Sequence, residues 1–304
     1  MKGKRILITG ASGFIGSHLV ERLAGGNDVH VILKGKECQR LSRIEDKINV
    51  HQGDVADRSF VKSVMDKCKP QIVFHLAGII KKDASDESFA ASMDVNFHGT
   101  LNLLMSLGKE TERFVFVSTS EGYVGKAPFL EEDSRLPLSP YSASKMLAET
   151  ACTFYFCSRK APVTILRPFI VYGPGQDKGM LIPDAIMSML GGKPLKTTKG
   201  EQTRDFVYIG DMVEALILTS SEKEAAGQTY NVCTGKETKI RDVVSEIARL
   251  TGGKSDAVLP YRENEVFSHF GDNSKLRSIG WEPKTGVHEG LKKTVEWYKN
   301  HASD

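Results

Sequence analysis

The sequence predicts an α/β fold built on a doubly wound parallel sheet, with a smaller C-terminal α/β lobe. Short runs of apolar, β-branched residues alternate with helical patterns through the first half of the chain. These runs are apolar almost throughout, as strands buried on both faces of a parallel sheet are. After Gly173 the alternation stops, and glycine and proline become frequent. The 304 residues suffice for one compact unit with an appended lobe.

The alternation places the expected elements in order along the chain. The expected strands are 5–9, 29–33, 48–51, 72–76, 114–118 and 163–167, with a further strand at 229–232. The expected helices are 17–23, 60–68, 95–107, 141–159, 181–190 and 211–220. The first four end at or before a glycine or proline, which stop helices. We therefore expect a first domain of residues 1–173 with 227–233, and a lobe of residues 174–226 and 234–304.

Composition excludes several classes of protein. The formal net charge is only +3 and the basic residues are scattered, so no nucleic-acid partner is expected. The apolar run near the N-terminus has three residues, and no run approaches the roughly 20 that a membrane helix needs. The cysteines show neither a CxxC pair nor metal-ligand spacing, and they are Cys38, Cys68, Cys152, Cys157 and Cys233. We expect reduced thiols, no metal and no membrane contact, in a soluble cytoplasmic protein.

A glycine-rich turn follows the first strand and opens the first helix. Its sequence is Gly10-Ala-Ser-Gly13-Phe-Ile-Gly16, with GxxGxxG spacing. Without side chains, the backbone N–H groups at a helix N-terminus can approach a pyrophosphate, which the helix dipole also favours. The alternative is a tight turn without a ligand. We expect a dinucleotide site whose contacts are Gly10, Ser12, Gly13, Phe14, Ile15 and Gly16.

The cofactor's adenosine end is expected near the second and third strands. About 20 residues after the turn, where a carboxylate would hold the ribose hydroxyls, the chain has Lys34 and Lys36. A lysine pairs with a 2′-phosphate, which favours NADP; the alternative is two solvated lysines, with NAD held by other contacts. Asp54 follows the third strand and is expected to accept from the adenine amino group, while the N–H of Val55 donates to the ring. The alternative for Asp54 is a turn residue.

The chemistry is expected at Tyr141 and Lys145, which the spacing of four places on one helical face after Pro140. A tyrosine with a pKa near ~10 is a poor base at neutral pH unless an ammonium stabilises its phenolate, and Lys145 would supply that charge. Lys145 would also hold the nicotinamide ribose. The run Ser118-Thr119-Ser120 ends the fifth strand, where open α/β sheets bind ligands. Taken alone, Tyr-x-x-x-Lys also occurs by chance on helices.

With these motifs the chain resembles the extended short-chain dehydrogenase/reductase family, in its NAD-dependent epimerase/dehydratase group, which includes UDP-glucose 4-epimerase. The likeness is nearly end to end, and the order of the motifs makes it specific. They are TGASGFIG, Phe74-His-Leu-Ala77, DVNFHGT, SPYSASK, LRPFIVYGPG, GEQTRDFVYIGD, TYNVCTG and LRSIGWEPKTGVHEGL. The resemblance implies a Rossmann fold and a nucleoside-diphosphate sugar as substrate.

The resemblance also implies roles for individual residues. Tyr141 and Lys145 would act with Thr119 or Ser120; counting from the strand favours Thr119, and counting back from Gly125 favours Ser120. Further cofactor contacts would be Leu76, Ala77, Gly78, Asn96, Ser118, Tyr141, Lys145, Pro168 and Val171. The substrate contacts would be Glu121, Tyr141, Arg204 and Arg262.

Arg204 and Arg262 would clamp the diphosphate, since a guanidinium pairs with phosphate in a bidentate fork. The alternative is that either is a surface arginine.

Three departures from the family limit these expectations. Lys34 replaces the acidic residue that binds the ribose, and Ile170 stands where many members have a substrate-binding Asn. Ser120-Glu121 follows Thr119, whereas the dehydratases have Asp-Glu there. Because water elimination needs an acid as well as a base, dehydration is not expected.

The expected reaction is 4-epimerisation of a nucleotide sugar. Tyr141 would remove the proton of the C4 hydroxyl while a hydride passes to the nicotinamide, and the 4-keto sugar would then be reduced on its other face. One rival is an NADPH-dependent 4-keto-sugar reductase, which Lys34 and Lys36 favour. Another is a dinucleotide-binding sensor without turnover. A homodimer is expected, because helices 95–107 and 141–159 resemble those that pair in the family.

Overall fold

The computed structural model describes residues 1–35, 39–81 and 83–301. Lys36 and Cys38, both named above, lie outside the described residues. The chain forms two compact units. Unit 1 comprises residues 1–124, 134–167 and 213–230, and unit 2 comprises 125–133, 168–212 and 231–304.

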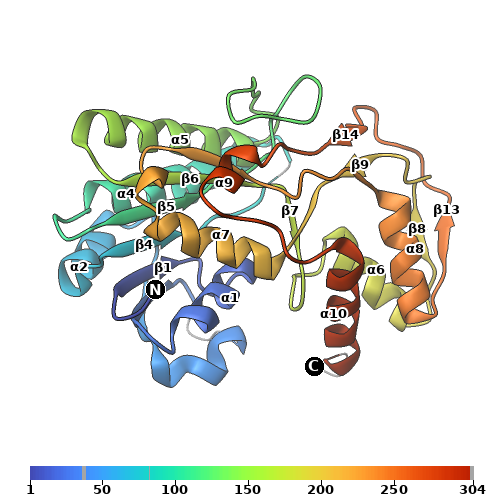
Figure 1. Ribbon diagram of the computed structural model, residues 1–304, viewed down its shortest axis with the longest axis horizontal. Coiled ribbons are helices and arrows are strands. Elements are labelled where there is room, and N and C mark those ends of the chain that lie inside the picture. The colour runs from blue at the N-terminus through green and yellow to red at the C-terminus, as the bar shows by residue number, and fades with distance from the viewer. Residues whose placement is uncertain (36–38, 82, 302–304) are drawn as a thin grey trace. The chain divides into compact units, whose positions relative to one another are not determined.

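A seven-stranded sheet forms the centre of unit 1 (Figure 1), in the order β11-β6-β5-β4-β1-β2-β3. Its strands are β1 (Arg5–Thr9), β2 (Asp28–Leu33), β3 (Asn49–Gln52), β4 (Ile72–His75), β5 (Arg113–Val117), β6 (Val163–Pro168) and β11 (Thr229–Val232). The pairs whose register is recorded are all parallel, with Ile6 of β1 opposite Val29 of β2 and Ile72 of β4. The predicted doubly wound parallel sheet is confirmed. Its strand order reverses at β1 and β4, the switch point at which such sheets bind ligands.

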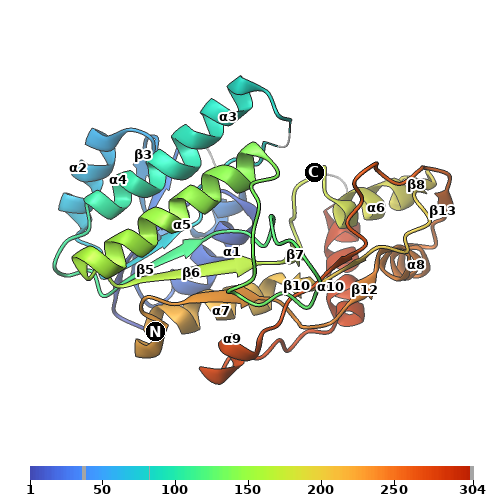
Figure 2. The same ribbon diagram turned by 90° about the horizontal axis from the view of Figure 1, so that it is seen from above.

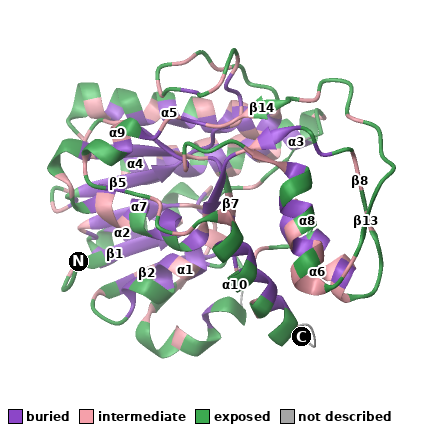
Figure 3. Ribbon diagram, turned by 45° about the vertical axis from the view of Figure 1, so that its right-hand side comes forward, coloured by how far each residue is buried: buried purple, intermediate pink, exposed green. Residues whose placement is uncertain are grey.

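Helices cover both faces of this sheet, with α2, α4 and α5 on one side and α1 and α7 on the other (Figure 1, Figure 2). They are α1 (Phe14–Leu23), α2 (Arg58–Cys68), α3 (Asp86–Ser92), α4 (Gly99–Met105), α5 (Pro140–Arg159) and α7 (Ile209–Ser221). Between them lie the 3-10 turns η1 (Gln39–Lys47) and η3 (Lys223–Ala225). Phe114 and Phe116 of β5 pack with Leu103 of α4 and Cys152 of α5 in the core. Figure 3 shows the sheet strands as mostly buried.

Helix α5 begins where the sequence signals predict. Pro140 occupies the first turn, where its missing N–H costs nothing. Ser139 caps the helix by accepting from the N–H of Ser142 at 3.1 Å, and the hydroxyl of Ser142 accepts from the N–H of Ser139 at 3.0 Å. This reciprocal cap holds the first turn of α5, and with it Tyr141.

The helix expected at 95–107 begins earlier in the structure. Ser85 caps α3 at Asp86, and the chain then passes through a π-helical segment, η2 (Met93–His98), into α4. The expected start was wrong because a π turn adds a residue to the helical repeat, which breaks the apolar periodicity. Asn96 is buried in the π turn.

Unit 2 is built from three longer helices, one short helix and small sheets. The helices are α6 (Leu181–Leu190), α8 (Ile240–Thr251), α9 (Ser274–Ser278) and α10 (Val287–Asn300). The strands pair as β7 (Ile170–Tyr172) with β10 (Phe206–Tyr208), β9 (Thr203–Arg204) with β12 (Thr238–Lys239) and β14 (Ser268–His269), and β8 (Leu195–Thr197) with β13 (Ser255–Ala257). Its core joins Ile186 of α6, Ile247 of α8 and Leu291 of α10 around Tyr172. The predicted smaller α/β lobe is confirmed.

The unit boundaries differ in detail from the expected domains, 1–173 with 227–233 and the remainder. Residues 213–226 group with unit 1. Arg113 of β5 donates to the carbonyl of Glu222 at 2.8 Å, and Thr164 of β6 donates to that of Ala225 at 2.6 Å. Residues 125–133 group with unit 2, where the N–H of Phe129 donates to Phe270 at 3.0 Å. These long-range bonds have no local sequence signal.

Candidate active site

The glycine turn is closely packed against the segment that follows β4. Gly10 has φ +70°, and a Cβ there would lie 2.6 Å from the backbone nitrogen of Ala77. Helix α1 begins at Phe14, and its N-cap Gly13 makes no side-chain cap, whereas Asp57 caps α2. The first N–H groups of α1 therefore keep their donors for another partner. A helix N-terminus with bare donors behind a glycine turn fits a pyrophosphate.

The residues expected at the adenosine end lie together at the ends of β2 and β3. The ammonium of Lys34 is 2.7 Å from a carboxylate oxygen of Asp54. Burial opposes ionisation of Asp54, but Lys34 and the N–H of Ala56 outweigh it and hold the pKa of this carboxyl below its usual value. Arg40 of η1 donates to the carbonyl of Ser12 in the glycine turn at 3.0 Å. Sequence reasoning missed Arg40, which lies in a 3-10 turn without apolar periodicity.

Asn96 fixes the segment after β4, where Leu76, Ala77 and Gly78 were expected to contact the cofactor. Its side chain accepts from the N–H of Ile79 at 2.8 Å and donates to the carbonyl of Ile79 at 3.0 Å. It also donates to the hydroxyl of Ser144 on α5 at 2.9 Å. A Cβ at Gly78 would lie 3.0 Å from Asn96 and 3.4 Å from the amine of Lys145. Gly78 therefore packs closely against Asn96 and Lys145, and a side chain there would have to displace one of them.

The side chain of Thr119, at the end of β5, acts on Tyr141 and favours its phenolate. The oxygen of Thr119 also accepts from the N–H of Glu121 at 3.0 Å. Burial raises the pKa of Tyr141 to about 12, and the carboxylate of Glu121 also raises it, whereas Thr119 and Arg135 act in the opposite direction. The phenol therefore carries its proton at neutral pH.

Lys145 points to β5 rather than to the phenol. Its amine donates to the carbonyl of Val117 at 2.7 Å and lies 4.7 Å from the ring centre of Phe116. Burial lowers the pKa of Lys145 to about 8. The expectation that Lys145 stabilises the phenolate differs from this geometry. Among the described residues, Thr119 and Arg135 are the groups that lower the pKa of Tyr141.

The three hydroxyls after β5 have different surroundings. Ser118 donates to the carboxylate of Glu149 on α5, whereas the side chain of Thr119 acts on Tyr141 and lowers its pKa. Ser120 is buried. Between the two residues that sequence counting left open, the geometry therefore favours Thr119 as the partner of Tyr141. The carboxylate of Glu121 accepts from the hydroxyl of Ser139, beside the first turn of α5.

Unit 2 brings the two expected phosphate-binding arginines near each other. Arg204 of β9 donates to the carbonyls of Thr203 and Val266, each at 2.7 Å, and pairs with Glu265 at 3.0 Å. Burial lowers the pKa of Arg204 and the charge of Arg262 lowers it further, while Glu265 opposes both. Sequence reasoning missed Glu265, although it stands three residues after Arg262.

The other residues named for unit 2 lie at its first strands. Pro168 ends β6, and Val171 pairs with Val207 across β7 and β10. Ile170 lies opposite Phe206 and is partly exposed.

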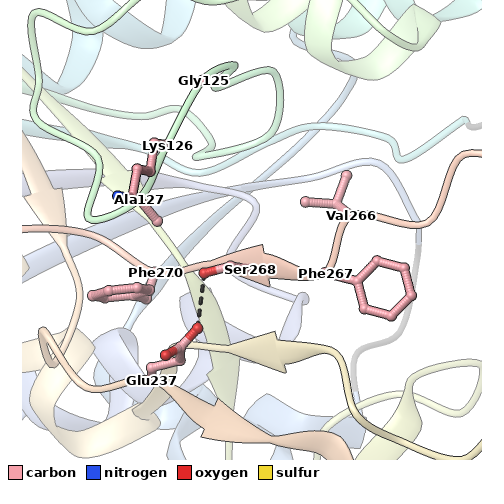
Figure 4. Close-up of a pocket in the computed structure, with 8 residues that line it drawn as sticks. All are labelled: Gly125, Lys126, Ala127, Glu237, Val266, Phe267, Ser268 and Phe270. Atoms are coloured by element: carbon pink, nitrogen blue, oxygen red, sulfur yellow. Dashed lines mark hydrogen bonds between the residues drawn. The ribbon is translucent and has the colours of Figure 1, made fainter.

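A hollow in unit 2 lies beside β14 and the residues that precede it, which include Val266, a partner of Arg204 (Figure 4). Gly125, Lys126 and Ala127 line one part of it, and residues of β14 with its flanks line another. Ser268 donates to Glu237 at 2.8 Å within it. Its lining combines one lysine, one glutamate and the apolar Val266, Phe267 and Phe270. Val266 links this hollow to Arg204 through its carbonyl.

Two further sequence expectations concern metals and membranes. Within residues 1–35, 39–81 and 83–301, His, Cys, Asp and Glu side chains nowhere gather in a group of three that suits a metal ion. The helices of this described part are too short or too polar to span a membrane. The described cysteines Cys68, Cys152, Cys157 and Cys233 are free thiols. The cytoplasmic location stays a prediction.

We predict that Gly10→Ala weakens dinucleotide binding at least about tenfold, or about 1.4 kcal/mol. The new Cβ requires the turn to move away from Ala77, and φ +70° strains any L residue. Titration calorimetry with NAD and with NADP measures the effect. Gly25→Ala is the matched control, because it follows the same helix and its Cβ would meet nothing within 4 Å. Equal affinities for the two variants would contradict a binding role for the turn.

Comparison with known proteins places this geometry in a family. The NAD dependent epimerase/dehydratase family model matches residues 6–233. The human dTDP-D-glucose 4,6-dehydratase is 33% identical over 319 residues, which cover 98% of this chain and 91% of the relative. The UDP-N-acetyl-alpha-D-glucosaminuronate decarboxylase of Bacillus cytotoxicus is 33% identical over 324 residues, covering 99% of each.

A solved structure shows the same relationship in three dimensions. The Thermus thermophilus UDP-glucose 4-epimerase, in a complex with NAD, has a TM-score of 0.87 and 30% identity, covering 97% of this chain and 99% of that one. The family match spans most of the chain, and it includes the glycine turn, Tyr141 and Lys145. The predicted resemblance is confirmed: the chain is an enzyme that belongs to the NAD dependent epimerase/dehydratase family.

Proposed function

We propose that this enzyme interconverts C4 epimers of a nucleoside-diphosphate sugar, with a bound NAD(P) as hydride carrier. The observation that carries the proposal is the phenol of Tyr141 near the C-terminal end of β5, where the side chain of Thr119 acts on it and favours its phenolate. It lies in the same unit as the glycine turn of α1, which fits a pyrophosphate. The Thermus thermophilus relative with this fold is a UDP-glucose 4-epimerase in a complex with NAD.

In such a reaction, some residues of unit 1 would hold the cofactor and others would move the proton. The glycine turn would hold the pyrophosphate of the dinucleotide, and Lys145, beside Asn96 and Gly78, would hold its nicotinamide ribose. When bound, the dinucleotide supplies the hydride acceptor and, after reduction, the hydride donor. Tyr141 would take the proton of the C4 hydroxyl and return it after the sugar has turned over. Thr119 would hold that hydroxyl against the phenol.

The pKa of Tyr141 sets the direction in which pH acts. With the pKa raised to about 12, the phenol is the resting form at neutral pH and is ready to protonate a 4-keto oxygen. Sugar oxidation needs the phenolate, whose population rises with pH up to that value. Positive charge brought into the site on binding lowers this pKa and makes the base accessible at lower pH.

The diphosphate of the substrate would bind the arginines of unit 2. A guanidinium forms two parallel hydrogen bonds to phosphate oxygens, so Arg204 and Arg262 suit this group. In this structure the carboxylate of Glu265 pairs with the guanidinium of Arg204, and a diphosphate would compete with Glu265 for the same N–H donors. Phosphate binding by Arg204 therefore requires that the Glu265 contact be exchanged.

We predict that Tyr141→Phe lowers epimerisation by about 10² to 10⁴-fold, because it removes the group that moves the proton. Proton NMR of the anomeric signals of UDP-glucose and UDP-galactose follows the reaction without a coupling enzyme. The matched control is Tyr155→Phe, a core position further along the same helix. Unchanged turnover in Tyr141→Phe would rule out the proposed base and favour a non-catalytic sensor.

A second candidate is a one-way NADPH-dependent reductase of a nucleotide 4-keto sugar. Two cationic side chains favour it: Lys34 at the end of β2, and Arg40, whose guanidinium is held by the carbonyl of Ser12. Basic groups near the adenosine ribose suit a 2′-phosphate. The absorbance of reduced nicotinamide separates the two reactions, because an epimerase regenerates its cofactor. Net consumption of NADPH with a 4-keto sugar would replace the epimerase proposal.

We predict that Lys34→Met weakens NADP binding at least about tenfold while NAD affinity changes by less than about twofold. The lost ammonium would pair with the 2′-phosphate that only NADP carries. Calorimetry with both dinucleotides measures the ratio. Lys62→Met is the control, since Lys62 forms a similar exposed pair with Asp66 on α2. An equal loss for both dinucleotides would contradict a 2′-phosphate contact.

We propose a homodimer formed through α5. Leu147 and Phe154 are 43% and 53% exposed and stand seven residues apart, on one face of the helix.

We predict that Leu147→Glu with Phe154→Glu yields a monomer, because the change places two charges in an apolar contact. Size-exclusion chromatography with light scattering measures the mass. Leu138→Glu, at an exposed leucine before the helix, should leave the mass unchanged. A wild-type monomer at every concentration contradicts the proposal.

A further inference from the structure

Residues 118–122, here called the hydroxyl loop, accept hydrogen bonds from Arg135, a buried arginine that lies later in the chain. Arg135 donates to the carbonyl of Thr119 at 2.9 Å and to that of Glu121 at 3.1 Å. Its other terminal nitrogen donates to Glu149 at 2.8 Å. The side chain is only 6% exposed. One guanidinium thus joins the loop that carries Thr119 to helix α5.

The backbone around Arg135 is bonded to the same loop. Arg135 forms an antiparallel bridge with Tyr123, and the N–H of Leu136 donates to the carbonyl of Gly122 at 2.7 Å. Gly122 has φ +103°, and a Cβ there would lie 2.6 Å from the carbonyl oxygen of Leu136. The main chain therefore sets the distance between Arg135 and the loop, and the side chain has little freedom to leave it.

Glu149 anchors this arginine in α5. Its carboxylate also accepts from Arg167 of β6 at 2.6 Å and from Ser118. Burial opposes ionisation of Glu149, but Arg167, Arg135 and Ser118 outweigh it and hold its pKa below the usual value. Two buried guanidinium groups thus share one carboxylate. Arg135, Arg167 and Glu149 together therefore carry one net positive charge next to the hydroxyl loop.

We propose that Arg135 is a positioning residue for the reaction at Tyr141: anchored by Glu149, it holds the carbonyls of Thr119 and Glu121 so that the Thr119 hydroxyl faces the phenol. This inference rests on the proposed function. Arg135 touches neither reacting group through its own hydrogen bonds. It acts through the backbone of the loop, and its positive charge acts on the phenol over a longer distance.

The positive charge of Arg135 lowers the pKa of Tyr141. The described charged groups acting on Tyr141 are Glu121, which raises the pKa of the phenol, and Arg135, which lowers it. Lys145, one turn along α5, bonds Val117 instead. Loss of Arg135 removes a positive charge and frees Thr119 to turn away, and both changes raise the pKa of Tyr141. The phenolate then forms at higher pH, so the limb of the pH profile on which activity rises with pH moves to higher pH.

Arg113 offers a matched control in the same unit. It is the first residue of β5, at the strand end opposite the hydroxyl loop, and it is buried like Arg135. It donates to the hydroxyl of Thr164 at 3.2 Å and to the carbonyl of Glu222. In the described structure, the Nε atoms of both arginines are buried without a partner. Arg113→Met therefore removes a comparable buried cation without touching the loop.

The test compares Arg135→Met, Arg135→Lys and Arg113→Met in kcat, KM, pH profile and thermal midpoint. We expect Arg135→Met to lower kcat at least about tenfold with KM changed less than about twofold, and to move the rising limb of the pH profile to higher pH. Arg135→Lys keeps the charge and one or two donors, so it should recover part of kcat and most of the pH profile. Arg113→Met should lower the thermal midpoint alone.

A double-mutant cycle tests the route through Thr119. If Arg135 acts by aiming that hydroxyl, adding Arg135→Met to Thr119→Val should cost less than it costs in the wild type. Additive effects of the two changes would contradict the route. The same holds if Arg135→Met behaves like Arg113→Met, with lower stability but unchanged kcat and pH profile.

A spectroscopic titration separates this inference from the proposed function. The ultraviolet absorbance of tyrosinate, taken as wild type minus Tyr141→Phe, reports the pKa of Tyr141 without any substrate. An upward shift of this pKa in Arg135→Met is expected even if the enzyme acts on another carbon or sugar. No shift in Arg135→Met overturns the inference. If Arg135→Met does not fold, Arg135→Gln, which also lacks the charge, gives the same test, and no shift in that variant overturns the inference. Active Tyr141→Phe overturns the proposed function instead.

Discussion

The burial of Glu149 between Arg135 and Arg167 is the interaction on which the geometry at the end of β5 depends. It ties α5, β6 and the hydroxyl loop to one carboxylate. Charges taken out of water cost free energy that only good partners recover, and removing one partner of such a pair costs about 3–5 kcal/mol. The carboxylate here has three partners, counting Ser118. The enzyme therefore holds Thr119 and Tyr141 together with an ionic cluster that solvent cannot replace.

Burial also explains the protonation of the site. It raises the pKa of Tyr141 to about 12 and lowers that of Lys145 to about 8, so both groups are driven toward their neutral forms. A tyrosine in this state donates a proton readily and accepts one only when charge in the site favours the phenolate. The expectation from the Tyr-x-x-x-Lys spacing was a lowered tyrosine pKa. That spacing gives the separation along the helix, but it does not give the direction of the lysine side chain, which bonds Val117.

Similarity alone leaves the reaction open, because relatives at the same 33% identity are described as a dehydratase and a decarboxylase. The choice among the reactions of the family rests on a few residues around the active site. Ser120 and Glu121 follow Thr119, Ile170 lies exposed on β7, and Lys34 pairs with Asp54. Each changes the local chemistry: the supply of an acid, the contact to the sugar, or the charge near the ribose. The epimerase proposal fits the proton-handling pair and the lack of an Asp beside Thr119.

The sequence by itself determined the elements whose signals are local. The strands 5–9 and 229–232 and the helix 181–190 match the structure residue for residue, because apolar runs and their glycine or proline boundaries are short-range patterns. The glycine turn and the helix start at Pro140 are likewise predicted from the sequence, since both depend on neighbours in the chain. Strands of two or three residues in unit 2 show no periodicity, and the π turn at Asn96 disrupts it. Only the tertiary structure decided that Lys145 bonds β5, that Lys34 meets Asp54, and that Arg135 reaches Glu149. These contacts join residues with no fixed spacing, so burial and packing, rather than local pattern, select them.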